Sequence, residues 1–147
     1  MRALENIMSV SVYGFISGIT TESQDAHNIL QLQALPATGA YLIKSLFSHV
    51  PQSKSHSYYG GHIHFSAAYK EFYCIDNEWL EEFETLLSNL YWNEAEIIVT
   101  WTRERYTWHS NYSNEAAKSE PNEIKERARF ESAWELKQIP WSSQHAL

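Results

Sequence analysis

Apolar and polar side chains alternate over residues 8–17, which predicts a β-strand. Its two faces carry Met8, Val10, Val12 and Ile16 on one side, and Tyr13 and Phe15 on the other. Because both faces lean apolar, we expect the rest of the fold to cover the strand on both sides. Gly14 and Gly18 are expected to mark a bulge and the end of the strand.

Two helices are expected next. Thr21 and Gln24 have the spacing of a capping box, so a helix should begin there and run to about Leu35, where Pro36 stops it. Residues 30–34 also alternate, which leaves a strand as the alternative for that part. A second helix, capped by Thr38, is predicted from apolar residues at helical spacing, namely Tyr41, Leu42, Leu46, Phe47 and Val50.

A half-buried strand is predicted over residues 62–73, after a serine-rich loop at 51–61. The side chains expected to face the core are Ile63, Phe65, Ala67, Tyr69 and Tyr73. Those expected on the polar, partly accessible face are His62, His64, Ser66, Ala68 and Lys70.

The strongest helical pattern covers residues 78–91, with Asp76 or Asn77 as the N-cap. Its broad apolar stripe consists of Trp79, Leu80, Phe83, Leu86, Leu87, Leu90 and Tyr91. The opposite side carries Glu78, Glu81, Glu82, Thr85 and Asn89. Acids near a helix N-terminus are favoured by the helix dipole, which explains Glu78 and Glu81 without any partner.

The C-terminal part is predicted to form two antiparallel strands, at 95–108 and 124–136, joined by a polar loop at 111–122. Residues 124–136 alternate cleanly as a strand and make a poor helical stripe. Across this pair, Arg103 and Arg105 are expected to meet Glu131 and Glu135.

This order of elements predicts an α+β fold, with a largely antiparallel sheet of about four strands and helices packed on one face. A chain of 147 residues fits a single domain spanning 1–147, and we expect residues 1–7 to be disordered. The single cysteine, Cys74, cannot form an internal disulfide, which indicates a reducing cytoplasm. Since no apolar run approaches roughly 20 residues, no membrane span is expected.

The chain is acidic, with a formal net charge of −7, and an acidic surface repels phosphate backbones. We therefore expect no nucleic-acid partner. Between Lys70 and Arg103 there is no lysine or arginine, although eight acids lie in that stretch. Such asymmetry either steers a basic partner or forms a solvated helix face.

His62 and His64 share a strand face and are the best candidates for metal ligands. A third or fourth ligand would have to come from His109, His56 or Cys74. Because no complete ligand set with metal spacing is visible, we expect no metal and no cofactor. The sequence also lacks a phosphate-binding glycine loop, a dinucleotide fingerprint and a serine elbow, so no catalytic residue is assigned.

Residues 63–67, Ile-His-Phe-Ser-Ala, resemble one half of the signature of the 2H phosphoesterases. In that family two such strands face each other, and their histidines act as general acid and base on a phosphodiester. The resemblance carries over only His64, as one of the two histidines, and Ser66. A second copy of the motif is required, and His109-Ser110 has the wrong spacing. A small enzyme or ligand-binding domain that uses His62, His64 and Ser66 is therefore the alternative function.

Aromatic residues crowd the predicted terminal strands, above all Trp101, Trp108 and Trp134. The helices cannot cover every face of such a sheet, and exposed tryptophans are typical of interface hot spots. They suit a partner protein or, as a further alternative, a homodimeric scaffold.

The acidic stretch Glu71–Glu96 and the aromatic segment Trp101–Trp134 resemble, in general character, the immunity proteins of bacterial polymorphic and contact-dependent toxin systems. That resemblance implies a non-enzymatic inhibitor that binds a cognate toxin domain one to one, often a basic nuclease. The expected binding residues are Glu78, Glu81, Glu82, Trp101, Trp108 and Trp134. The acids would imitate the phosphates of the toxin's substrate and speed association.

Overall fold

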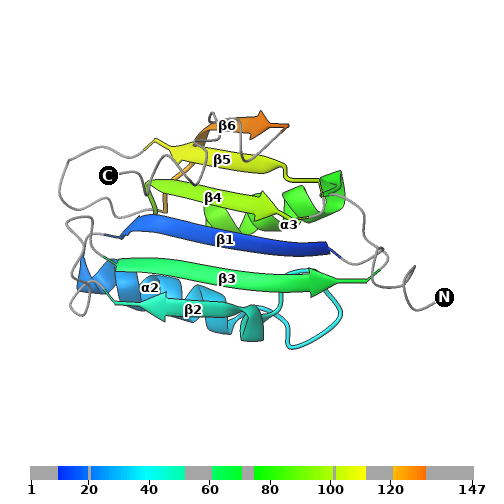
Figure 1. Cartoon of the computed structure of the whole chain (residues 1–147). Coiled ribbons are helices and arrows are strands. Elements are labelled where there is room, and N and C mark those ends of the chain that lie inside the picture. Colours follow the sequence, from blue (N-terminus) through cyan, green and yellow to red (C-terminus); the bar gives the residue numbers. More distant parts are fainter. Residues whose placement is uncertain are drawn as a thin grey trace, which may run out of the picture.

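The computed structural model describes residues 10–19, 21–51, 61–70, 75–100, 102–111 and 121–131. They form an α+β fold around an antiparallel sheet in the order β2-β3-β1-β4-β5-β6 (Figure 1). The strands are β1 (Val10–Ile19), β2 (Phe47–Val50), β3 (Gly61–Tyr69), β4 (Glu94–Val99), β5 (Arg105–Ser110) and β6 (Ile124–Phe130). The helices are α2 (Glu22–Gln33), the short 3-10 turn η1 (Lys44–Leu46) and α3 (Asn77–Ser88).

The α+β prediction with a largely antiparallel sheet is confirmed, whereas the count of four strands is wrong, since the described residues form six. The predicted strand at 95–108 is two strands, β4 and β5, joined by a tight turn. In that turn Arg103 has a φ of 58°, a left-handed conformation that arginine rarely adopts. The turn was missed because no glycine, proline or asparagine marks it.

The central strand β1 pairs with β3 on one side and β4 on the other. Val10, Val12 and Ile16 are buried as expected, but Tyr13 and Phe15 are exposed. The prediction of a strand covered on both faces is therefore wrong for the described part of the chain. Gly14 leaves room for a core ring, because a Cβ built there would lie 1.9 Å from Cε1 of Phe65.

Both helices have the predicted caps and lie behind the sheet in Figure 1. The Thr21 hydroxyl accepts from the Gln24 amide at 3.2 Å, and the Asp76 carboxylate accepts from the Trp79 amide at 2.9 Å. The predicted apolar stripe of α3 is buried throughout. Its rings continue those of the sheet, since Phe83 lies 5.7 Å from Phe65 and 4.8 Å from Trp108 between ring centroids.

The helix predicted after Thr38 is wrong. Residues 34–43 are irregular, and the apolar residues beyond them form η1 and the edge strand β2. Pairing of β2 with β3 places Phe47 opposite Phe65 and His49 opposite Ile63, so both side chains face inward. Pairing with β3 stabilises residues 47–50 as a strand more than their helical spacing stabilises a helix. Such a distant pairing does not show in the local periodicity of the sequence.

The last strand is confirmed, since β6 pairs antiparallel with β5, although residues 132–136 lie outside the described residues. Among the described residues, neither Arg103 nor Arg105 forms the expected ion pair with Glu131. Arg129 binds Glu104 at 2.7 Å and Arg127 binds Glu84 at 3.0 Å, while Arg105 lies 3.7 Å from Glu96. Arg129 also lies 4.0 Å from Glu131, and Glu135 is outside the described range. Among the described helices, none is long and apolar enough to cross a membrane.

Candidate partner-binding face

One face of the sheet is buried under the helices, and the described part of the chain leaves the other face uncovered. This open face consists of the outward side chains of four central strands. They are Ser11, Tyr13, Phe15 and Ser17 of β1, His62, His64, Ser66 and Ala68 of β3, Glu94, Glu96 and Ile98 of β4, and Arg105, Thr107 and His109 of β5. Pleating places them together because alternate residues of a strand share a face.

The centre of the open face is aromatic. Tyr13 and Phe15 remain 53% and 45% exposed, although both are large apolar groups. The Phe15 ring lies 5.2 Å from the His62 ring, which in turn lies 5.9 Å from the His64 ring. Burial first, and then the neighbouring His64 and His49, lower the pKa of His62, so its neutral form is favoured. A strip of aromatic and imidazole rings therefore runs across β1 and β3.

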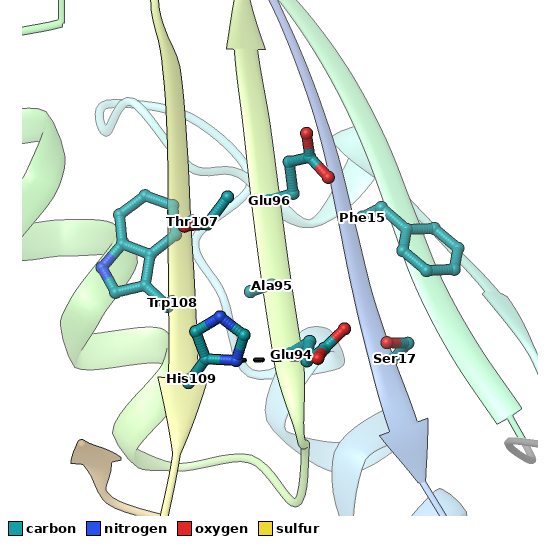
Figure 2. A pocket seen from close by; sticks show the side chains of 8 residues that line it. All are labelled: Phe15, Ser17, Glu94, Ala95, Glu96, Thr107, Trp108 and His109. Carbon is teal, nitrogen blue, oxygen red and sulfur yellow. Dashed lines mark ion pairs between the residues drawn. The ribbon is translucent and has the colours of Figure 1, made fainter. Parts of the chain in front are cut away.

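Beside Phe15 the face is hollowed, as Figure 2 shows, with a volume of about 200 Å³. The outward side chains around this hollow are Phe15, Ser17, Glu94, Glu96, Thr107 and His109; Ala95 and Trp108 complete the lining. We call it the Glu94–Glu96 hollow. It combines two carboxylates, two hydroxyls and an aromatic wall, the groups that surround an ammonium or guanidinium ion in proteins.

Both carboxylates of the hollow are accessible and only loosely paired. The Glu94 Oε1 atom lies 3.6 Å from His109 Nδ1, the contact dashed in Figure 2. The Glu96 Oε1 atom lies 3.7 Å from Arg105 Nε, which is too long for a hydrogen bond. The guanidinium of Arg105 instead lies over the Phe130 ring, 4.2 Å from its centroid. Each carboxylate can therefore accept hydrogen bonds from an incoming cation.

His62, His64 and Ser66 lie on the open face of β3, where alternation predicted them. Sheet pairing places Ser48 and Phe15 beside His64. His109, on β5, is three strands away, roughly 14 Å by ordinary strand spacing. A 2H phosphoesterase site requires a second histidine-bearing strand that faces the first. Within the described ranges, no such strand faces His64.

A metal site also finds no support in the described residues, where no group of three or more His, Cys, Asp or Glu side chains could hold an ion. Two of the residues considered as further ligands, His56 and Cys74, lie outside those residues. The absence of a metal or cofactor stays a prediction for the whole chain.

The predicted acidic residues of α3 line a groove of about 620 Å³ between α2 and α3. Glu78 and Glu81 are exposed there, beside Leu35 and Leu86. Glu82 differs from them, because its Oε1 atom accepts a hydrogen bond from the Leu42 amide at 3.3 Å. It helps to hold the segment before η1 and is not simply a surface charge.

The tryptophans predicted to anchor a partner are Trp101, Trp108 and Trp134, and the structure describes only Trp108. Trp108 is fully buried, and its indole N–H donates to Glu84 at 2.8 Å, so it cannot reach a partner in the folded protein. The position of Trp108 on an inward-facing register, opposite Ala95, is the physical reason. Trp101 and Trp134 lie outside the described residues. Among the described residues, the large aromatic side chains that are exposed are Tyr13 and Phe15, which the sequence pattern predicted to be covered.

Comparisons with models of known protein families, with curated proteins and with solved structures find no match to this chain.

Proposed function

We propose that this protein is an inhibitor that binds another protein, as immunity proteins do, and that its partner is a basic toxin domain in the cytoplasm. The open face of the sheet would be its interface. The observation that carries the proposal is the exposed pair Tyr13 and Phe15, next to the carboxylates Glu94 and Glu96 on an uncovered sheet face.

The aromatic pair supports protein binding because it leaves much apolar area in water. Of the three large apolar residues that are exposed in the described part of the chain, two are Tyr13 and Phe15. An aromatic side chain buries roughly 150–250 Å² when it is fully covered, so about half of that remains for a partner at each residue. Covering it would contribute about 2 kcal/mol per ring, the size of an interface hot spot.

The charge distribution favours a basic partner. Glu94 and Glu96 are accessible on the open face, and the groove between the helices adds Glu78 and Glu81. Neither α2 nor α3 carries a lysine or arginine. Carboxylates on two sides of a chain of net charge −7 attract a cationic protein from a distance and raise its association rate. In the Glu94–Glu96 hollow, an arginine or lysine of the partner would find both counter-charge and an aromatic wall.

The test first asks whether the gene directly upstream encodes a secreted protein with a toxic C-terminal domain, and then produces that domain together with this protein in the same cells. We expect the wild-type protein to restore growth. Tyr13→Ser and Phe15→Ser should lose protection, because each removes a ring that would be buried in the complex. The matched control is Leu30→Ser, which removes a 64% exposed apolar side chain on α2, outside the open face.

Two results would contradict the proposal. If the wild-type protein neither protects nor binds the purified toxic domain, the inhibitory function is wrong. If it protects, and the folded Tyr13 and Phe15 variants protect equally well, the interface lies elsewhere than on the open face.

A further inference from the structure

A second hollow lies between α2 and the edge strand β2, with a volume of about 420 Å³. Its lining is mixed, with Ile29, Leu32 and Gln33 from α2, Lys44 and Ser45 from η1, and Phe47 and His49 from β2. Register with β3 turns Phe47 and His49 toward the helices, whereas Ser48 lies beside His64 on the open face. The volume falls in the range of small-molecule sites. We call it the α2–β2 pocket.

We propose that the α2–β2 pocket binds a small amphipathic carboxylate. The apolar body of the ligand would lie against Ile29, Leu32 and Phe47, and its carboxylate would pair with the Lys44 ammonium. This inference does not depend on the proposed inhibitory function, because the pocket lies on the helix side of the sheet and the proposed interface lies on the other side.

Charge complementarity selects an anion. Lys44 is exposed, and no carboxylate of a described residue lies within ion-pair distance of it. None of the residues that line the pocket is acidic. Residues 3–43 contain no lysine or arginine, so the ammonium of Lys44 follows a long stretch without positive side chains. A ligand anion would therefore meet a cation with no competing partner in the pocket wall.

Asp25, the acid that contacts the pocket residue His49, is already engaged. Its Oδ1 atom lies 3.1 Å from Nε2 of His49, and the two side chains are only 7% and 11% exposed. The bond fixes the orientation of the imidazole and engages the Asp25 carboxylate with His49. With Nε2 of His49 donating to Asp25, Nδ1 of the neutral ring is an acceptor and offers nothing to a carboxylate. The Ser45 hydroxyl is the polar donor of the pocket wall that stands beside Lys44 in sequence and can bond the ligand carboxylate.

The experiment is a titration of the full chain, followed through its backbone amide NMR signals, with hexanoate and with its neutral analogue hexanamide. We expect saturable shifts at residues 29–33 and 44–49 with both. Hexanoate should bind about fivefold more tightly, the value of an accessible ion pair of about 1 kcal/mol. Lys44→Gln should abolish this preference for the carboxylate, and Lys44→Arg should retain it. Ile29→Ser should weaken both ligands alike.

The matched control is Lys125→Gln, which removes the same charge from the exposed surface of β6. It should leave both affinities unchanged, whereas a general charge effect would lower hexanoate binding in both lysine variants equally. The proposal is overturned if neither ligand shifts the pocket residues, or if hexanamide binds as tightly as hexanoate to the wild-type protein. These results say nothing against inhibition of a toxin, so the two proposals fail separately.

Discussion

Glu104 is a buried carboxylate whose replacement should show how the sheet is held together at its β5–β6 side. Only 6% of the residue is exposed. Its Oε2 atom accepts from the Arg129 guanidinium at 2.7 Å and from the Tyr106 hydroxyl at 3.0 Å. Burial alone would raise the pKa of Glu104, but hydrogen bonds from Thr102, Arg129 and Tyr106 outweigh it, so its pKa lies below the ordinary value.

We predict that Glu104→Gln lowers the free energy of unfolding by about 2 kcal/mol at neutral pH. The amide keeps the shape of the side chain. It turns the Tyr106 bond, worth about 1.5–3 kcal/mol to a carboxylate, into a neutral bond of about 0.5–1.5 kcal/mol, and it removes the ion pair with Arg129. Arg129 is half-exposed, so water can solvate its guanidinium once the Glu104 charge is removed. This solvation limits the decrease in the free energy of unfolding. Because the folded-state pKa is lowered, the stabilisation is present above the unfolded pKa of about 4.3 and is lost as the pH falls through the folded pKa.

The assay is urea unfolding followed by tryptophan fluorescence, since Trp79, Trp92 and Trp108 are all fully buried. The control is Glu96→Gln, which removes an accessible carboxylate 3.7 Å from Arg105 and should cost less than about 1 kcal/mol. The reasoning is refuted if Glu104→Gln costs no more than Glu96→Gln, or if its cost is the same at pH 3 as at pH 7.

Two further predictions concern the core and the acidic groove. Gly14→Ala should lower the free energy of unfolding by about 1–3 kcal/mol in the same urea assay, because the added methyl group meets the Phe65 ring, which is packed against Phe47 and Phe83. Combining it with Phe65→Leu should recover part of that loss, and additive losses in the double variant would contradict the proposed clash. Reversing Glu78 and Glu81 to Lys should leave unfolding within about 0.5 kcal/mol but slow association with a basic toxin domain and weaken its salt dependence, measured by stopped flow; an unchanged rate would make this side of α3 a solvated surface.

Much of the fold could be predicted from local patterns. Caps at Thr21 and Asp76, the stripe of α3 and the two faces of β3 all depend on residues close in sequence. The errors arose where distant pairing decides. Residues 47–50 become a strand because the edge of β3 is available to them, and the turn around Arg103 depends on the register between β4 and β5.

The candidate site was only partly predictable, because alternation tells which residues share a face but not whether anything covers that face. His64 and Ser66 were placed correctly, yet Phe15 was assigned to the interior and Trp108 to the surface. The Glu94–Glu96 hollow forms only when β1, β4 and β5 are neighbours in the sheet. The local sequence of a single strand does not predict this order.

The position of β1 in the middle of the sheet has a consequence for how the chain folds during synthesis. The ribosome synthesises β1 before both strands that pair with it. Of these two, β3 comes first in the chain, and β4 follows only after α3. Until β3 and β4 have both been synthesised, β1 lacks its pairing strands, and the apolar side chains of Val10, Val12 and Ile16 cannot be buried in the sheet. Pairings between segments so far apart carry a large loop-closure entropy, so folding should be slow for a domain of this size and should start in the α3–β4–β5 region, where contacts are more local.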